Sequence, residues 1–455
     1  MKREELAELS KEDLITIIIH IAERIAELEA ELADRKPPKG KAVPDGIKAN
    51  RPKKEQKEKR RKRASDHNHG RRLETPTRTV DHRLDYCPEC NLHLYGESLD
   101  YARQVVELPP PRPYEVIEHR VIKRFCPCCC QWQSPTLDLK GQVLGHGRIG
   151  VRVTSLIAYL RNTLRLPVRR IQSYLLSIHQ LTISIGEIVE LLHEMRRMTA
   201  QEVENLKQQA LASNILHADE TGWREDGQNG YIWSFSTPGE QGVRLYEFDR
   251  SRAQAVVKRI LGDEFHGHLV TDYYAGYNDY EGPQQRCWTH LLRDLHLLKE
   301  NYGKEADVLR WAQDVRDVYD DAQAWLRLPR EPTMVEREMK YVELVSRTHL
   351  LGLEYAKIKK HPCKALAKRL LRHEDELFQF VLVDGLSADN NLAERSIRPL
   401  VVVRKISGGS RGTEGTKTRM ALASLFETWQ ARGLNPFAEC LKILSCRASP
   451  ATQAL

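Results

Sequence analysis

Hydrophobic residues near the start of the chain recur at a helical spacing. They are separated by four, three, four, three and four residues, and they are Leu14, Ile18, Ile21, Ile25, Leu28 and Leu32. A period of about 3.5 residues is typical of the seam of a coiled coil, which predicts such a helix over residues 1–36. Because only about two and a half heptads are present, an amphipathic helix that packs on its own protein stays an alternative.

The pattern changes after Pro37 and Pro38. Residues 37–79 lack the apolar side chains that a core requires, and they predict a basic, disordered linker. Residues 141–205 predict three helices, the third of which begins with Ser184 and Glu187 in a capping box. Two short helices with a tight connection favour a helix-turn-helix-like DNA-binding region, although any small helical bundle would show the same pattern.

Strand-like segments begin near residue 214. Three of them, with turns at 227–230 and 238–242, predict an antiparallel meander, and a helix and a fourth strand follow. The predicted ranges are 215–219, 231–236 and 243–248 for the meander, 252–261 for the helix and 268–272 for the fourth strand. This order of elements is the start of a ribonuclease H-like sheet, in which the first and fourth strands lie side by side.

Composition and charge indicate what kind of partner the protein binds. Charged residues make up 29% of the 455 residues and the net charge is +8. Between Lys48 and Arg72, twelve Lys and Arg stand against three Asp and Glu, so this segment accounts for the whole net charge. Such a segment binds a polyanion through release of counterions from phosphates. We expect DNA contacts there from Arg60, Arg61, Lys62 and Arg63, and in the helical region from Arg169 and Arg170.

Targeting segments are not apparent in the sequence. No apolar run approaches the ~20 residues of a membrane span, and no basic segment followed by an apolar stretch and a cleavage site is present. These features predict a cytoplasmic protein associated with the nucleoid.

Six of the ten cysteines lie between residues 87 and 130. Cys87 and Cys90 form one CxxC pair, and Cys126 and Cys129 form another. Two such pairs complete the tetrahedral thiolate shell that Zn²⁺ prefers, and the alternating residues 101–125 predict a small sheet between them. The sequence therefore predicts a zinc ribbon-like domain over 80–140. Cys128 or Cys130 stays an alternative ligand, and free buried cysteines remain the simpler interpretation.

Two of the predicted strands end on acids, Asp219 and Asp272. If the strands are adjacent, both carboxylates can hold the pair of Mg²⁺ ions that two-metal phosphoryl transfer requires. A third acid, Glu394, follows Asp389 and Asn390 in a short helix. Glu220 points to the opposite face of its strand, whereas His217 shares the face of Asp219. The spacing alone is also explained by ordinary acids at strand ends and helix caps.

Several longer motifs identify the chain more specifically. It resembles IS66 family insertion-sequence transposases, which are of the DDE type, over essentially its whole length. The segments that carry the resemblance are His217-Ala-Asp-Glu-Thr-Gly-Trp223, Thr271-Asp-Tyr-Tyr-Ala-Gly-Tyr277, Cys287-Trp-Thr-His290, Asn390-Asn-Leu-Ala-Glu-Arg-Ser-Ile-Arg-Pro399, Arg404-Lys-Ile-Ser-Gly-Gly-Ser and Met420-Ala-Leu-Ala-Ser-Leu-Phe-Glu-Thr-Trp429.

The resemblance implies a multidomain protein. Its parts are an N-terminal coiled-coil helix, a zinc ribbon-like segment, a helix-turn-helix and an α/β ribonuclease H-like catalytic domain over 206–294 and 386–432. A large all-helical insertion occupies 295–385, and a C-terminal segment occupies 433–455. Asp219, Asp272 and Glu394 correspond to the family's catalytic acids, which hold two Mg²⁺ or Mn²⁺. Four basic residues after the third acid are placed to hold phosphates: Arg395, Arg398, Arg404 and Lys405.

The expected function is that of a DNA transposase. It would bind the ends of an insertion sequence and catalyse metal-dependent strand cleavage and strand transfer through the Asp-Asp-Glu triad. We expect a homodimer or larger assembly in the active complex, and small accessory proteins of the same element as further partners. A DNA-binding protein that has lost catalysis and a stand-alone nuclease of the same fold are the alternatives.

Overall fold

The computed structural model of the protein describes residues 75–108, 110–144 and 147–446. The chain divides into two compact units, Met1–Leu108 and Pro109–Leu455, and each is considered by itself. The predicted coiled-coil helix, most of the basic linker with Arg60, Arg61, Lys62 and Arg63, and the last nine residues lie outside the described residues.

Regular structure is sparse around the cysteine pairs. In the first unit, the described residues form one isolated bridge between Tyr86 and His93. In the second unit, β1 (Arg124–Cys126) and β2 (Gln131–Gln133) form a short antiparallel hairpin. The strands predicted within 101–125 are absent from the described residues before Arg124, so that prediction was wrong. Side chains such as Val105 and Val121 are exposed there, because an alternating segment forms a strand only where a partner strand accepts its hydrogen bonds.

Four helices precede the sheet. They are α3 (Val151–Asn162), α4 (Val168–His179), α5 (Ile185–Met198) and α6 (Ala200–Leu211). The first three are the helices predicted over 141–205, and Ser184 caps α5 by accepting a hydrogen bond from the backbone N–H of Glu187 at 3.0 Å. Their apolar faces share one continuous core with the sheet, so these helices pack on the sheet directly.

The central sheet has five strands in the order β5-β4-β3-β6-β7. Their bounds are Ile215–Glu225 for β3, Gln228–Ser236 for β4, Arg244–Asp249 for β5, His268–Thr271 for β6 and Gln284–Arg286 for β7. β3, β4 and β5 form the predicted antiparallel meander, and β3 pairs with β6 in parallel, as predicted. The first turn is narrower than expected because Asp226 and Gly227 both have positive φ, which closes a two-residue hairpin.

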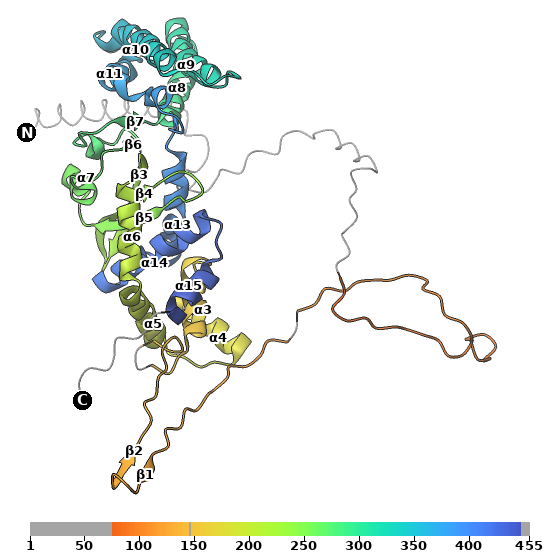
Figure 1. Cartoon of the computed structure of the whole chain (residues 1–455). Coiled ribbons are helices and arrows are strands. Elements are labelled where there is room, and N and C mark those ends of the chain that lie inside the picture. Colours follow the sequence, from red (N-terminus) through yellow and green to blue (C-terminus); the bar gives the residue numbers. More distant parts are fainter. Residues whose placement is uncertain (1–74, 109, 145–146, 447–455) are drawn as a thin grey trace, which may run out of the picture. The chain divides into compact units, whose positions relative to one another are not determined.

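The two faces of the sheet bury different helices. Leu216, Trp233 and Phe235 contribute to the core that includes α7 (Gln254–Leu261) and α6. On the other face, Ile232 and Tyr246 pack with residues of α13 (Asn391–Ser407) and α14 (Thr413–Ala431). Figure 1 shows these two helices running alongside the strands, with α15 (Pro436–Cys446) next to α3. Residues of β3 therefore face α13 and α7 alternately.

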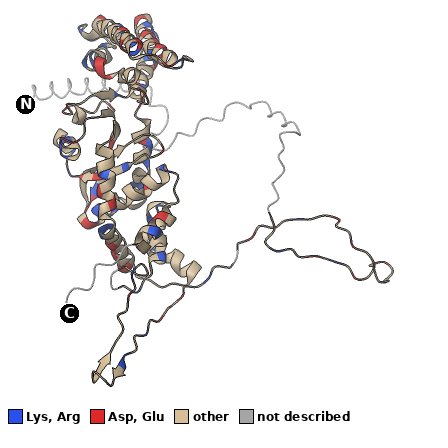
Figure 2. Ribbon diagram, in the orientation of Figure 1, with Lys and Arg blue, Asp and Glu red and all other residues tan. Residues whose placement is uncertain are grey.

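The predicted helical insertion follows β7, a strand that the sequence pattern did not predict. Its helices are α8 (Trp288–Asn301), α9 (Ala306–Leu326), α10 (Met334–Ala356), α11 (Lys364–His373) and the short α12 (Gln379–Leu382). They enclose a second core, to which Trp288 and Trp311 contribute. Acidic and basic residues are interspersed along the helices of the insertion (Figure 2), and Arg316 and Asp320 of α9 form an ion pair. None of the described helices is long and apolar enough to cross a bilayer.

Candidate active site

The two strand-end acids lie at the same edge of the sheet. In the parallel pair of β3 and β6, His217 stands opposite Val270. Continuing this register by two residues brings Asp219 beside Asp272, which directly follows β6. Backbone N–H groups hold both carboxylates, since Asp219 accepts from Glu220 at 2.9 Å and Asp272 accepts from Tyr274 at 2.8 Å. The structure therefore brings these two predicted residues together.

Asn390 fixes the third acid against the same strand. Its side-chain N–H donates to the carbonyl oxygen of Ala218 at 2.7 Å, and its Oδ1 lies 3.1 Å from Nδ1 of His217. Because Oδ1 can only accept, Nδ1 of His217 carries the proton. The backbone N–H of Asn390 also donates to the sulfur of Cys287 at 3.2 Å. Glu394 lies in the first turn of α13, so these bonds anchor its helix beside Asp219.

Like charges gather at this edge of the sheet. Burial raises the pKa of Asp219 to about 7, and repulsion from Glu220, Asp272 and Glu394 adds to the effect. Burial lowers the pKa of His217 to about 4, so its imidazole is neutral at pH 7 and does not offset the acids. Within the described ranges, no three His, Cys, Asp or Glu side chains are arranged as ligands of one metal ion. The acids are therefore close enough to repel one another without forming a closed ligand shell.

Two neighbours of the acids have distinct partners. Glu220 lies on the α7 face of β3, where it accepts a hydrogen bond from the hydroxyl of Tyr277 and pairs with Arg252. His290 lies on the other side, with Nε2 3.7 Å from a carboxylate oxygen of Glu394. Its Nδ1 is buried and has no hydrogen-bond partner among the described residues. Trp288 belongs to the insertion core and donates to the carbonyl of Leu377 at 2.6 Å.

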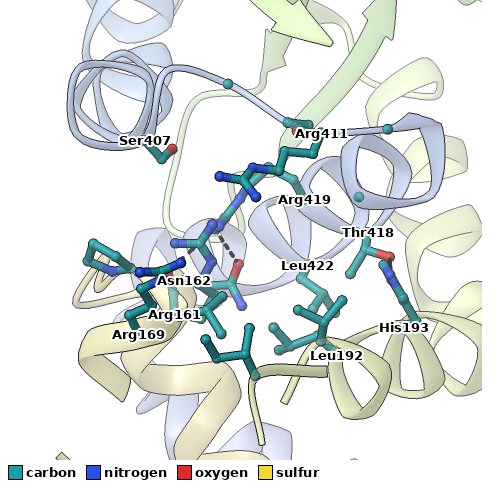
Figure 3. Close-up of a pocket in the computed structure, with 18 residues that line it drawn as sticks. Arg161, Asn162, Arg169, Leu192, His193, Ser407, Arg411, Thr418, Arg419 and Leu422 are labelled. Atoms are coloured by element: carbon teal, nitrogen blue, oxygen red, sulfur yellow. Dashed lines mark hydrogen bonds between the residues drawn. The ribbon is translucent and has the colours of Figure 1, made fainter. Parts of the chain in front are cut away.

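The predicted DNA-contacting arginines fall into three environments. Arg395 and Arg398 are exposed on α13, and Lys405 is exposed near its end. Arg404 instead turns back to β3, where it donates to the hydroxyl of Thr221 at 3.0 Å and to the carbonyl of Gly222. Arg169 and Arg170 are both exposed on α4, and Arg169 also lines a cavity between the helical region and α14 (Figure 3).

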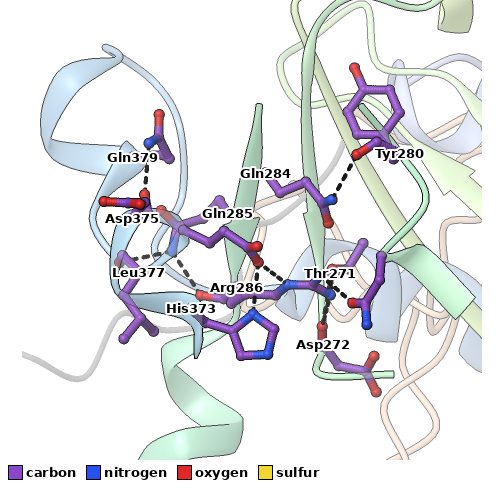
Figure 4. Close-up of polar contacts among 12 residues, drawn as sticks. Thr271, Asp272, Tyr280, Gln284, Gln285, Arg286, His373, Asp375, Leu377 and Gln379 are labelled. Carbon is purple, nitrogen blue, oxygen red and sulfur yellow. Dashed lines mark hydrogen bonds and ion pairs between the residues drawn. The ribbon is translucent and has the colours of Figure 1, made fainter. Parts of the chain in front are cut away.

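Arg286 holds the backbone of Asp272 in place (Figure 4). This guanidinium is 1% exposed. It donates to the carbonyl of Asp272 at 2.9 Å, to the hydroxyl of Thr271 at 3.0 Å and to the side chain of Asn278 at 2.8 Å. It also pairs with Glu376, which in turn lies 3.0 Å from Nδ1 of His373. The insertion therefore stabilises the loop that carries the second acid.

The two cysteine pairs have the same local geometry. Backbone N–H groups of Cys90 and Glu89 lower the pKa of the Cys87 thiol, and those of Cys129 and Cys128 lower the pKa of the Cys126 thiol. The residue after each pair has positive φ, 57° at Asn91 and 52° at Cys130. Cys130 thus occupies the place of Asn91, and its thiol lies 3.6 Å from the carbonyl of Pro127. The two turns lie in different units of the chain.

Several residues of the site were not predicted from the sequence in these roles. Asn390, Cys287 and Arg286 all hold an acid or its element in place, yet Asn390 contacts Ala218 and Cys287, and Arg286 contacts Glu376, across long stretches of the chain. The only sequence signal for Asn390 and Cys287 is that both stand in the motifs that carry the family resemblance.

Comparison with known proteins identifies the class. Residues 146–418 match the family model described as "Transposase IS66 family". This match covers more than half of the chain, and the chain belongs to the IS66 family of transposases, which are DNA-processing enzymes. It is also 27% identical over 214 residues to the uncharacterized protein y4qI of Sinorhizobium fredii (strain NBRC 101917 / NGR234). That alignment covers 42% of this chain and 38% of the relative's length.

Proposed function

We propose that the protein binds the ends of an insertion sequence and catalyses metal-dependent cleavage and transfer of DNA strands. The observation that carries the proposal is the meeting of three acids from distant segments. Asp219 and Asp272 are neighbours in a parallel register, and Glu394 is anchored beside them through Asn390. The strand order, with an antiparallel meander beside a parallel pair, supports a ribonuclease H-like catalytic domain.

The donor set suits hard divalent cations. Asp219, Asp272 and Glu394 offer only carboxylate oxygens, which Mg²⁺ and Mn²⁺ prefer. Burial, together with repulsion from the neighbouring acids, raises the pKa of Asp219, and bound cations would take the place of its proton. Glu220 has its own partners in Arg252 and Tyr277, so we assign it no metal. A pair of bound Mg²⁺ would activate the attacking oxygen and stabilise the leaving oxygen.

The residues of the chain would act by positioning. Arg286 donates to the backbone carbonyl of Asp272, and Asn390 ties the start of α13 to Ala218, so both would keep the second and third acids at the sheet edge. The neutral His217 supports Asn390 without adding a positive charge. The exposed Arg395 and Arg398, which follow Glu394 on α13, would contact phosphates of the strand that enters the site.

A strand-transfer assay tests this proposal. Labelled DNA that carries the end of the surrounding element would be incubated with Mg²⁺ or Mn²⁺ and wild type, Asp272→Asn or Asp279→Asn. Asp279 is an exposed acid seven residues further along, so its variant removes the same charge outside the site. We expect cleaved and joined products from wild type and Asp279→Asn, and roughly a thousandfold less from Asp272→Asn, which should still bind the DNA.

Other outcomes would point to other functions. Equal activity of Asp272→Asn would show that the acids are assigned wrongly. End-specific binding without any product would favour a DNA-binding protein that has lost catalysis. Cleavage without joined product would favour a nuclease.

The zinc site stays a proposal from the sequence. Cys87, Cys90, Cys126 and Cys129 are the proposed ligands, and the matching turns support these pairs over ones that include Cys128 or Cys130. Metal analysis of purified protein would find about one Zn²⁺ per chain, lost in Cys126→Ser and kept in Cys130→Ser. Loss in Cys130→Ser alone would reverse the assignment. Dimerisation through residues 1–36 and accessory proteins of the element likewise remain proposals.

A further inference from the structure

A second concentration of like charge lies at the other end of α13. There, a cavity of about 550 Å³ opens between the helical region and the start of α14. Its apolar floor includes Leu192 of α5 and Leu422 of α14 (Figure 3). Four arginines line it, namely Arg161, Arg169, Arg411 and Arg419, and no Asp or Glu is among the described lining residues. We refer to this cavity as the arginine pocket.

Arg419 is the least exposed of the four, at 8%. Its guanidinium donates to Oδ1 of Asn162 at 3.2 Å and lies 3.4 Å from the carbonyl of Arg161. Arg161 in turn donates to the carbonyl of Leu166 at 2.9 Å. Neither arginine forms an ion pair within the described part of the chain, so both cations have only neutral partners. Burying a charge without a counter-charge is unfavourable, which calls for an explanation.

The electrostatics agree with this geometry. Burial lowers the pKa of Arg161 to about 10. Burial also lowers the pKa of Arg419, and the neighbouring charge of Arg161 lowers it further. Figure 3 shows Arg411 reaching from its loop toward the same space as Arg419. An anion in this space would relieve both the desolvation of the guanidinium groups and their repulsion.

The loop beside the pocket is held rigidly. Ser410 donates through its backbone N–H to the carbonyl of Arg224 at 2.8 Å, and Asp226 donates back to the carbonyl of Ser410 at 2.9 Å. Gly409 has φ of 128°, and a Cβ there would lie 2.1 Å from the carbonyl oxygen of Arg224. The loop ends at Gly412, where α14 begins. The first backbone N–H groups of this helix add partial positive charge beside the pocket.

We propose that the arginine pocket binds one nucleotide of a DNA strand, with its phosphate held by the arginines and its sugar over the apolar floor. The inference rests on the proposed function, because it takes DNA as the substrate. The cavity is larger than a single phosphate requires and falls within the usual range for small-molecule sites. Arginine suits this role because its planar fork of donors matches the oxygens of a phosphate.

The length of α13 relates this site to the acids. Glu394 lies in the first turn of the helix and Ser407 is its last residue. An α-helical rise of ~1.5 Å per residue separates the two by about 20 Å. Duplex DNA carries one phosphate per strand for each ~3.4 Å of its axis, so a duplex whose axis runs parallel to α13 covers this distance in about six nucleotides. The bound phosphate would therefore lie about six nucleotides from the cleaved bond, if the strand follows the helix.

Binding measurements on the full chain test the proposal. The affinity for a duplex carrying the element end would be measured against salt concentration for wild type, Arg419→Gln and Arg411→Gln. Arg316→Gln is the matched control, because it removes one positive charge from the exposed surface of α9. We expect the pocket variants to bind about tenfold more weakly at 0.1 M salt and to lower the logarithmic salt slope by about one. The control should match wild type.

A neutral phosphate identifies the contact directly. A methylphosphonate would be placed at successive positions of the DNA strand. It should weaken DNA binding by wild type when it stands about six nucleotides from the cleaved bond. Arg419→Gln should be insensitive at that same position, because it has already lost the contact. Arg411→Gln guards against a folding defect, since Arg411 is exposed at the mouth of the pocket.

Free phosphate compounds are the competing source of the same chemistry. The melting temperature of wild type and Arg419→Gln would be compared with and without 10 mM inorganic phosphate or deoxyadenosine monophosphate, roughly the range in which weak ligands stabilise measurably. Stabilisation of wild type alone, together with an unchanged salt slope in Arg419→Gln, would overturn the DNA assignment in favour of a free ligand. An unchanged salt slope in Arg419→Gln, without stabilisation of wild type by either compound, would show that the arginine pocket is not an anion-binding site. If wild type itself bound no DNA, the proposed function would fail first.

Discussion

The two ends of α13 contrast in charge but follow the same physical logic. At its first turn, Glu394 approaches Asp219 and Asp272, and burial with repulsion raises the pKa of Asp219 to about 7. Beyond its last residue, the partly buried Arg161 lies beside the buried Arg419; burial lowers the pKa of both guanidinium groups, and the charge of Arg161 lowers the pKa of Arg419 further. A protein that gathers like charges in this way loses stability, and such sites are commonly places where an oppositely charged ligand binds.

A third buried charge shows the alternative arrangement. Arg286 is as inaccessible as Arg419, yet it pairs with Glu376 and donates to Asp272, Thr271 and Asn278. Its charge is fully used inside the protein, so its role is structural. The contrast between Arg286 and Arg419 teaches that burial alone does not identify a ligand site. What identifies it is burial without a counter-charge.

The largest expected loss of stability follows removal of Arg286, whose charge is compensated inside the protein. Arg286→Met should lower the free energy of unfolding by about 3–5 kcal/mol, because Glu376 and the carbonyl of Asp272 lose their partner while they remain in the fold. Urea denaturation followed by circular dichroism measures it. Arg316→Met, on the exposed surface of α9, should change stability by less than about 1 kcal/mol. A loss of similar size in both variants would contradict the structural role of Arg286.

The acids near the first turn of α13 should make the stability of the protein depend on pH. The pKa of Asp219 is raised from 3.8 to about 7 in the folded protein. Between these values the folded chain holds a proton that the unfolded chain has lost, so stability falls as pH rises through this window. The loss should be about 2–4 kcal/mol for this residue, measured by urea denaturation at pH 5 and pH 8 with a chelator present.

Two variants isolate this contribution. Asp219→Asn should be less sensitive to pH than wild type, whereas Asp279→Asn should follow wild type. Added Mg²⁺ should stabilise wild type more at pH 8 than at pH 5, because the cation and the proton compete for the same carboxylates. Equal pH dependence of Asp219→Asn and wild type would mean that the acids do not repel one another as the structure indicates.

These charges differ in how far the sequence could predict them. Asp219 and Asp272 were predictable because each ends a local strand pattern, and the meander followed by a helix and a strand implied which strands are adjacent. Asn390 contacts Ala218 across 172 residues of the chain, Arg286 contacts Glu376 across 90, and Arg419 contacts Asn162 across 257. Local periodicity carries no information about such pairs, so neither the anchoring of α13 nor the arginine pocket was predicted.

Local pattern also misled in one place. The alternating residues 101–125 predicted a sheet, but the described residues there are exposed and form no strand before Arg124. β3 and β4, by contrast, are covered by helices on both faces. Residues 101–125 have no covering layer among the described residues, so their apolar side chains stay exposed and no strand is stabilised there. The Asp226-Gly227 hairpin, by contrast, was visible in the sequence as a turn signal that was placed too broadly.

An intermediate loss of stability is expected when Asn390, which anchors the first turn of α13, is replaced. Asn390→Ala removes the bond to the carbonyl of Ala218 and the partner of His217, both of which are buried. Stability should fall by about 1–3 kcal/mol. The rate of strand cleavage should fall more than the affinity for DNA, because the variant loosens Glu394 without touching the arginine pocket. Asn391→Ala, one residue further along, is the control. A matching loss of DNA affinity would show that the two ends of α13 are not independent.

The smallest expected change in stability sharpens the comparison of the two buried arginines. Arg419→Met removes a charge that has only neutral partners, Asn162 and the carbonyl of Arg161. The relief of desolvation and of repulsion from Arg161 should offset the lost hydrogen bonds, so the free energy of unfolding should stay within about 1 kcal/mol of wild type. Urea denaturation of Arg419→Met and Arg286→Met under one condition makes the test. If Arg419→Met lost as much stability as Arg286→Met, its guanidinium would be a structural element, and the case for an anion in the pocket would rest on the binding data alone.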